Sequence, residues 1–405
     1  MPVSVKVVDG ADTPIPNQPV VFQITEGAGS VSDAAVQTSV DGVATTRWTI
    51  GTSTTASQIL QAQIVHPTTH DILLLAEFHA TALADAPTSL EKTAGDGQTA
   101  AAGSAVTNAP TVKAVDQFSN PVSGKDVVWR IVAGGGTIGG GATATSQTNA
   151  AGAATPPGSW VLGPAPAANT LTASVTGAPD VTFSATGVTG PPSRLAFVIP
   201  PSTVATNGQN LSRLPVVQLT DNFGNPVKLS GEVVQITQVA NSGAGTLQIL
   251  NDTTRTDANG VATFTGTQLN GPVGDGYRIA FATPTTSKLE SDPISVLRGQ
   301  PSALTILVPA DGATRGSTFS VQPVIRSVDA GGNPVPAGDC INVRIQPPEV
   351  LTGSTQVTGV GDTFMFNSVG VDATTPPGIY TLTYNTGCCA PSSALRPAMQ
   401  SIEVR

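Results

Sequence analysis

Short stretches of alternating apolar and polar residues recur along the chain. Val20, Phe22 and Ile24 would lie on one face of a strand, with Gln23 on the other. The same alternation recurs in residues 60–64, 127–131, 171–175, 341–345 and 380–384. Because successive side chains of a β-strand point to opposite faces, this pattern predicts many short strands. Turns rich in Gly, Pro, Asn and Asp separate them, which favours antiparallel β-sandwiches; an up-and-down barrel is the main alternative.

An eight-residue motif repeats along the chain. It reads VDGADTPI from Val8, VDQFSNPV from Val115, TDNFGNPV from Thr220 and VDAGGNPV from Val328. A marker of the form P-[ST]-x-L precedes the last three copies. A third marker, such as TDANGVATFTGTQLNG from Thr256, follows the first three. Their common order predicts four domains, over residues 1–85, 86–190, 191–299 and 300–405.

The repeated motif has the composition of a tight turn. Its aspartate side chain is expected to accept hydrogen bonds from the turn backbone, and its proline to fix the exit. Gly224 and Asn225 are both expected to adopt positive φ. This interpretation makes the motif structural and assigns it no ligand. Its predicted residues are Asp9, Asp116, Asn120, Pro121, Asp221, Asn225, Pro226, Asp329, Asn333 and Pro334.

The first repeat is shorter than the others before its aspartate. Only eight residues precede Asp9, whereas the proline marker lies 28 or 29 residues before each later aspartate. We therefore expect the first sandwich to lack its first strand, which would leave an exposed sheet edge. One interpretation is a fragment or processed chain. The other is strand complementation, in which a neighbouring chain supplies the strand and builds a fibre.

Together, these markers resemble those of bacterial immunoglobulin-like group 1 repeats, which build the stalks of invasin and intimin adhesins. The resemblance is strongest in the second and third repeats. The first repeat matches from its second strand onward. The fourth lacks the TDANG marker, and its TPPGIYTLTY looks like a broader class of bacterial Ig-like domain. The resemblance implies a secreted or surface-exposed bacterial rod and identifies no binding site. The receptor-binding end of those adhesins is a separate lectin-like domain.

Composition narrows the classes of function. The formal net charge is −9, and only 11% of residues are charged. The sequence contains no basic stripe that would neutralise phosphates, so we expect no nucleic-acid partner. No apolar run approaches the length of a membrane span. The first residues, MPVSVKVVDG, read as a strand and not as a signal peptide.

The few chemically active side chains do not form a recognisable active site. The segment HPTTHD predicts a hairpin tip that brings together His66, His70 and Asp71, and His79 lies further along. We interpret these as solvated turn residues and not as metal ligands. TDANG lacks the spacing of a calcium loop. Without a nucleophile beside a base, or acids paired in a cleft, we expect no enzyme and no cofactor.

The three cysteines all lie in the last repeat. Cys340 would pair with Cys388 or Cys389 if the protein is extracellular, and free thiols are the alternative. Tyr277 and Tyr380 each enter a late strand. Each is expected to be either a corner tyrosine, whose hydroxyl bonds back to the backbone, or a simple core aromatic.

Two functions follow from these observations. The first is a non-enzymatic extracellular structural or adhesive protein, a semi-rigid rod of Ig-like modules. The alternative is a self-assembling subunit of a filament or phage-like appendage, with other protein chains as partners in a homo-oligomer or fibre. A carbohydrate-binding array is a weaker third option. It would need exposed aromatics, whereas Trp48, Trp129 and Trp160 are expected in the core.

Overall fold

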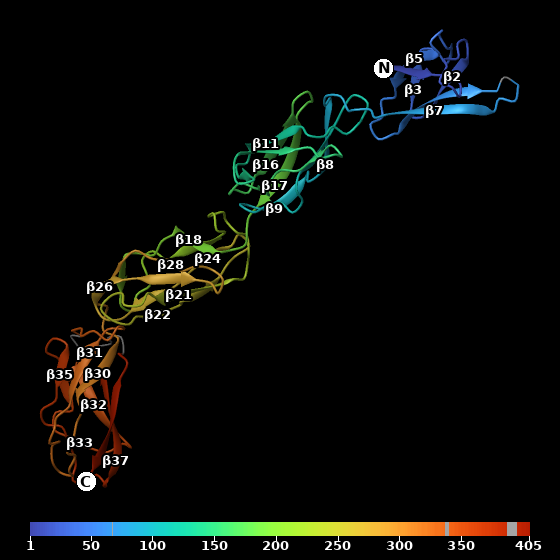
Figure 1. The fold of residues 1–405 in the computed structure, drawn as a ribbon. Coiled ribbons are helices and arrows are strands. Elements are labelled where there is room, and N and C mark those ends of the chain that lie inside the picture. Colours follow the sequence, from blue (N-terminus) through green and yellow to red (C-terminus); the bar gives the residue numbers. More distant parts are fainter. Residues whose placement is uncertain (67, 337–339, 387–394) are drawn as a thin grey trace. The chain divides into compact units, whose positions relative to one another are not determined.

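The structure is a computed structural model that describes residues 1–66, 68–336, 340–386 and 395–405 (Figure 1). The described residues form strands joined by turns, bends and irregular segments, and no helix occurs among them. The all-β, immunoglobulin-like sandwich class predicted from the alternating pattern is confirmed.

Four separate hydrophobic clusters form the cores. Their buried residues fall within residues 3–64, 90–185, 195–296 and 304–404, and we call the four clusters, each together with the strands that pack around it, modules 1 to 4. The chain divides into two compact units, Met1–Thr189 with modules 1 and 2, and Gly190–Arg405 with modules 3 and 4. The predicted domain boundaries lie between the clusters and remain predictions.

Module 1 packs two sheets, with strand orders β1-β5-β3 and β4-β2-β6-β7. Phe22 and Trp48 are fully buried between them. Its strands are β1 (Pro2–Lys6), β2 (Pro19–Glu26), β3 (Gly29–Val31), β4 (Ala35–Gln37), β5 (Val43–Ile50), β6 (Gln58–Val65) and β7 (Ile72–Ala80).

Module 2 has sheets of order β14-β10-β8, β13-β11-β16-β17-β9 and β12-β15. Its first strand is divided between two sheets, because β8 pairs antiparallel with β10 and β9 pairs parallel with β17. Its strands are β8 (Ser89–Ala94), β9 (Gln98–Ala101), β10 (Thr111–Val115), β11 (Asp126–Ala133), β12 (Thr137–Ile138), β13 (Thr143–Gln147), β14 (Ala153–Ala154), β15 (Trp160–Val161), β16 (Ala168–Val175) and β17 (Val181–Val188).

Module 3 repeats this arrangement, with sheets β18-β20-β24, β19-β29-β26, β23-β21-β27-β28 and β22-β25. Its strands are β18 (Arg194–Ile199), β19 (Val204–Thr206), β20 (Val216–Thr220), β21 (Val233–Gln238), β22 (Gln248–Leu250), β23 (Thr253–Arg255), β24 (Val261–Thr263), β25 (Gln268–Asn270), β26 (Gly274–Tyr277), β27 (Ile279–Ala282), β28 (Leu289–Glu290) and β29 (Ile294–Leu297).

Module 4 has sheets β30-β31-β35, β34-β32-β37-β38 and β33-β36. Its strands are β30 (Ala303–Val308), β31 (Val324–Val328), β32 (Cys340–Gln346), β33 (Leu351–Thr352), β34 (Gln356–Thr358), β35 (Thr363–Met365), β36 (Gly370–Val371), β37 (Gly378–Thr386) and β38 (Ala398–Val404).

The strand that leads into the repeated turn has two neighbours in modules 2 to 4 and one in module 1. The strands β10, β20 and β31 each lie between a first strand and a later strand. Within the described residues, β1 pairs with β5 alone. Among the described residues, module 1 has no counterpart of β8, β18 or β30.

The tyrosines and tryptophans occupy the predicted positions. The hydroxyl of Tyr277 donates to the Pro272 carbonyl at 2.7 Å, and that of Tyr380 donates to the Pro376 carbonyl at 3.0 Å. Both are therefore corner tyrosines and not simple core aromatics. The three tryptophans Trp48, Trp129 and Trp160 are buried, as expected of core residues.

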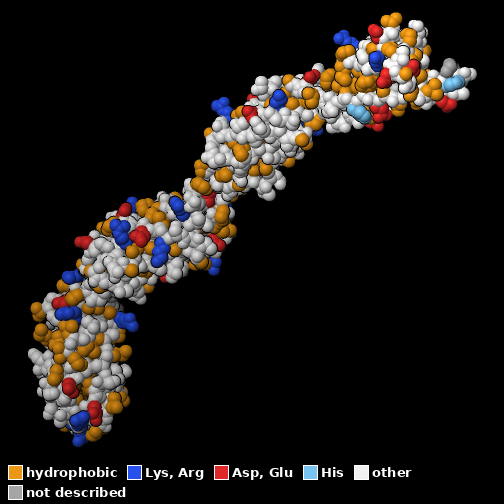
Figure 2. Space-filling model, viewed as in Figure 1, with side chains coloured by type: hydrophobic (Ala, Val, Ile, Leu, Met, Phe, Trp, Pro, Cys, Tyr) orange, Lys and Arg blue, Asp and Glu red, His pale blue; other side chains and the backbone are white. Residues whose placement is uncertain are grey.

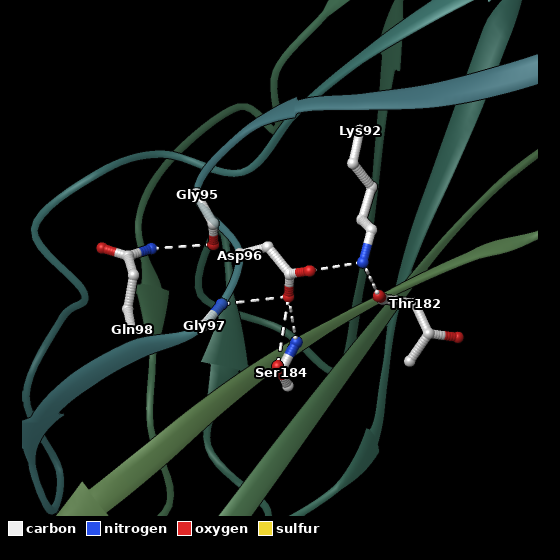
Figure 3. A network of polar contacts seen from close by, with 7 residues as sticks. All are labelled: Lys92, Gly95, Asp96, Gly97, Gln98, Thr182 and Ser184. Carbon is white, nitrogen blue, oxygen red and sulfur yellow. Dashed lines mark hydrogen bonds and ion pairs between the residues drawn. The ribbon is translucent and has the colours of Figure 1, made fainter.

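A polar network fixes the point at which the first strand of module 2 changes sheets (Figure 3). The chain crosses from β8 to β9 at Gly95-Asp96-Gly97. One oxygen of Asp96 pairs with Lys92, and the other accepts the Gly97 and Ser184 backbone N–H groups at 3.0 and 2.8 Å. The Lys92 hydrogen bond, followed by that of the Ser184 backbone, lowers the pKa of Asp96 to about 2.

Replacing Asp96 with alanine should destabilise module 2 by about 1 kcal/mol at neutral pH, which is less than is usual for a hydrogen bond to a charged group because the carboxylate is partly exposed. Since the folded pKa lies below the ordinary 3.8, this contribution is complete above that pH and is lost as pH falls from 3.8 towards 2. Urea unfolding at pH 7 and pH 2 measures the difference. Asp126→Ala, which removes an exposed carboxylate bonded to Gln147, is the control. A constant gap between Asp96→Ala and wild type at both pH values would contradict the assignment.

Candidate functional site: the turns at the module junctions

The repeated turn is closed by its own aspartate. In module 3, Asp221 Oδ1 accepts the backbone N–H groups of Phe223 and Asn225, each at 2.9 Å. The same oxygen of Asp116 and Asp329 accepts the equivalent groups at 2.8 to 2.9 Å. The carboxylates of these three residues are buried. A short acceptor side chain at the strand end thus supplies the partners that the turn backbone would otherwise lack.

One residue of each turn is left-handed. Gly224 has φ of 85° and Gly332 of 82°, and the equivalent Ser119 and Asp12 adopt 65° and 62°. Asn225 does not adopt positive φ, so the expectation for that residue is wrong. A single left-handed residue completes the turn, and the asparagine side chain is instead directed back to Asp221, to which it donates at 2.9 Å.

The second carboxylate oxygen holds the segment that enters the module. Asp116 Oδ2 accepts the Asp85 N–H at 3.1 Å, and Asp221 Oδ2 accepts the Gly190 N–H at 3.1 Å. In module 4, Asp329 Oδ2 accepts the Gly299 N–H at 2.9 Å. One buried carboxylate therefore ties the turn and the incoming linker to the same point.

In two modules, the asparagine of the turn also reaches the preceding module. The amide of Asn120 donates to the Thr52 carbonyl at 2.7 Å and accepts the Thr54 N–H at 3.0 Å. Both partners lie in module 1.

The amide of Asn333 makes the same pair of bonds to module 3. It donates to the Gly271 carbonyl at 2.9 Å and accepts the Val273 N–H at 2.9 Å. Because each amide donates and accepts at once, it fixes both a distance and an orientation between two modules.

The first copy of the turn keeps the aspartate and lacks the asparagine. Asp9 Oδ1 accepts the N–H groups of Ala11 and Thr13, each at 2.9 Å. Thr13 occupies the position held elsewhere by Asn120 or Asn333. The turn closure is thus independent of the amide that bridges modules.

The hydrogen bonds also keep these carboxylates ionised. Burial on its own would raise the pKa of Asp116 and Asp221. The hydrogen bonds outweigh it, led by those from the side chains of Asn120 and Asn225, and the pKa of each aspartate lies below 3.8. The pKa of Asp9 is lowered by the backbone N–H groups of Thr13 and Ala11.

The sequence identified these turn residues but did not predict the hydrogen bonds of Asn120 and Asn333 to the preceding module. Two features of the sequence pointed towards these bonds. The Asn lies four residues after the Asp in each turn that has both, and the third marker ends in a glycine, Gly51 or Gly271, close in sequence to the residues that the amide contacts. Neither signal identifies the bridge alone, because the two segments meet only after both modules have folded.

The other candidate residues lie apart from the junction turns. His66 Nδ1 accepts the N–H groups of Thr68 and Thr69 at 3.2 Å within its own hairpin tip, and His79 lies near Glu77 on β7. In the part of the chain that the structure describes, no group of three or more His, Cys, Asp or Glu residues is placed to hold a metal ion. Cys340 is disulfide-bonded. Cys388 and Cys389 lie outside the described residues, so the pairing stays a prediction.

Comparisons with known proteins relate the chain to Ig-like domains. Residues 190–297 match the family model described as SMCHD1 Ig-like domain 6. This model covers module 3 and less than half of the chain. No curated protein matches the chain. Among the described residues, no helix is long and apolar enough to cross a membrane.

Several solved structures are similar in part. Invasin, a bacterial integrin-binding protein, is 16% identical over 100% of this chain and 75% of its own, with a TM-score of 0.31. FdeC, an Escherichia coli adhesin, is 14% identical over 79% and 99%, with a TM-score of 0.27. The tetra-tandem repeat from the extending region of a large adhesion protein is 19% identical over 96% and 92%, with a TM-score of 0.26.

Proposed function

We propose that the chain is a non-enzymatic, extracellular or surface-exposed bacterial protein with a structural or adhesive role, in which Ig-like modules form a semi-rigid rod. The observation that carries the proposal is the two-point amide bridge at Asn120 and again at Asn333. A chain whose modules merely followed one another would not need a side chain that fixes their relative orientation. The resemblance of the sequence markers to adhesin stalk repeats supports the same role.

The proposal predicts that these amides stiffen the chain. In the double variant Asn120→Ala, Asn333→Ala, small-angle X-ray scattering should show a broader distribution of dimensions and a flexible-chain signature absent from wild type. The folded modules should persist, because Asp116 and Asp329 still close each turn. The matched control is Asn149→Ala, which removes a turn-capping asparagine whose partners Ala151 and Ala153 lie within its own module.

Two results would contradict this role. One is a wild-type scattering profile already typical of freely jointed modules. The other is an unchanged profile in the double variant, which would show that the bridges do not restrict the modules.

The alternative function is a subunit of a filament or phage-like appendage assembled by strand complementation. It requires a donor strand, and β8, β18 and β30 are already paired within their own modules. The structural or adhesive rod is therefore the preferred proposal.

A further inference from the structure

In modules 2 and 3, part of the first strand runs beside the last strand and in the same direction. In module 2, β9 pairs parallel with β17 over four consecutive residues, from Gln98 to Ala101. In module 3, β19 pairs in the same way with β29 over three residues, from Val204 to Thr206. The chain therefore enters the first strand at one end of this parallel ladder and leaves the last strand at the other end.

This geometry decides how each ladder responds to tension. Modules 2 and 3 each have another module before and after them in the sequence, so a pull along the chain draws the first strand backwards and the last strand forwards. Because the two strands are parallel, these opposed forces act along the ladder and load its evenly spaced hydrogen bonds together, in shear. A strand pair pulled apart from one end would instead open one bond at a time.

Hydrogen bonds at both ends extend the ladder of module 2. Before β9, the Gly97 N–H donates to the Ser184 carbonyl at 2.9 Å. The Asp96 carboxylate also accepts the Ser184 N–H at 2.8 Å, so the network of Figure 3 holds β17 at the point where β9 begins. After β9, the Ala102 N–H donates to the Val188 carbonyl at 2.7 Å. The contact that resists shear thus continues past both ends of the strand pair.

The ladder of module 3 is extended in the same way. Before β19, the Ser295 N–H donates to the Thr203 carbonyl at 2.9 Å. After β19, the backbone N–H and the side-chain amide of Asn207 both donate to the Leu297 carbonyl, each at 3.1 Å. Asn207 is 1% exposed, and a hydrogen bond in such surroundings is stronger than one in water because the local dielectric constant is low.

Both strands of each ladder are also anchored in a core. In module 2, Ala185 of β17 belongs to the core and Ala100 of β9 packs against it. In module 3, Ala205 of β19 and Val296 of β29 are both core residues. Sliding one strand past its partner would therefore also draw apolar side chains out of the core, which adds to the resistance.

Backbone hydrogen bonds, and not ion pairs, join these strands. Figure 2 shows charged side chains scattered singly or in small groups over the visible face of the modules. Among the described residues of modules 2 and 3, Lys92 and Asp96 form the one ion pair. The resistance of the ladders to tension should therefore change little with salt.

We propose that modules 2 and 3 bear tension, and that the parallel ladders β9–β17 and β19–β29 keep them folded when the chain is pulled from both sides. The function is that of a tether, which transmits force along the chain without lengthening. A stiff rod resists bending, whereas these ladders resist extension. The inference therefore goes beyond the rod function and does not depend on the amide bridges.

Ala102 is the position at which one bond of the ladder can be removed with little other change. It is the second residue of a turn in which the Ser104 N–H donates to the Ala101 carbonyl at 2.9 Å, and Gly103 has φ of 69°. These are features of a type II turn, which accepts proline at its second residue. The variant Ala102→Pro therefore withholds the donor from the Val188 carbonyl and keeps the turn.

Single-molecule force spectroscopy tests the proposal on residues 1–405, pulled by handles at both ends. At constant force, Ala102→Pro should raise the unfolding rate of one module at least about tenfold, because one of the bonds loaded in shear is lost. Without force, its unfolding rate in urea should change far less, since the end of a strand can detach before the core unfolds.

The matched control is Ala150→Pro, which should unfold under force like wild type. Ala150 is the second residue of another turn of module 2, in which the Gly152 N–H donates to the Asn149 carbonyl at 2.8 Å, and it lies outside the ladder. A second variant, Asp96→Ala, keeps every backbone bond and releases the Ser184 N–H. Its unfolding rate should also rise more under force than without force.

Three outcomes would overturn the inference. They are an unchanged rate at constant force in Ala102→Pro, an equal rise with and without force, and an equal effect of Ala150→Pro. If circular dichroism shows that Ala102→Pro does not fold, the comparison of Asp96→Ala with and without force decides in its place. None of these outcomes bears on the scattering test of the junctions, so the two proposals fail separately.

Discussion

The variant Asp221→Ala should lose about 3 kcal/mol of unfolding free energy in module 3. Asp221 is 1% exposed, and its carboxylate accepts hydrogen bonds from the Gly190, Phe223 and Asn225 backbone N–H groups and from the Asn225 side chain. Alanine leaves these part-buried donors without their acceptor, and each donor left unsatisfied costs about 1 kcal/mol. Chemical denaturation at pH 7 measures the loss.

A second aspartate in the same module provides the control. Asp257 Oδ1 also closes a turn, accepting the N–H groups of Asn259 and Val261 at 2.8 and 2.9 Å, but it is exposed and holds no linker. Asp257→Ala should therefore cost about 1 kcal/mol. Equal losses in the two variants would show that burial and the linker bond of Asp221 add nothing.

The pKa of Asp221 predicts how its contribution to stability changes in acid. The pKa of Asp221 is lower in the folded protein than its ordinary 3.8, because the hydrogen bonds outweigh the effect of burial. Its contribution is therefore present above pH 3.8 and is lost as pH falls below that value. The difference between wild type and Asp221→Ala should shrink in strong acid.

The variant Phe281→Ala should destabilise module 3 by about 4 kcal/mol, because it opens a cavity at the centre of the core. Phe281 is fully buried and meets Phe197 and Phe264 edge-on, at centroid distances of 5.3 and 5.6 Å. Calorimetry should show one transition moved down by roughly 15 °C, as expected for a domain of this size.

The loss should stay within module 3, because the four clusters share no residue. Hydrogen–deuterium exchange should show faster exchange in residues 195–296 and unchanged exchange in residues 90–185. Phe223→Ala, which truncates a phenylalanine that is 51% exposed in the same module, is the matched control. Loss of protection in module 2 as well would contradict separate cores and the predicted domain boundaries.

The class of fold and the period of the repeat could be predicted from the sequence, because both depend on residues that are close to one another along the chain. Alternation such as that of Val20, Phe22 and Ile24 fixes which side chains enter the core, and two of these three are fully or nearly fully buried. Tight turns also follow from local chemistry, since Asp221 and Gly224 act on residues within their own turn.

Tertiary structure decided what the turn does beyond its own module. The bonds from Asn120 to Thr52 and Thr54 join residues more than sixty positions apart, and nothing in either segment specifies the other. Local patterns specify strands and turns because those depend on neighbours in sequence, whereas the amide bridges depend on distant backbone groups that only the folding of both modules brings within hydrogen-bond distance.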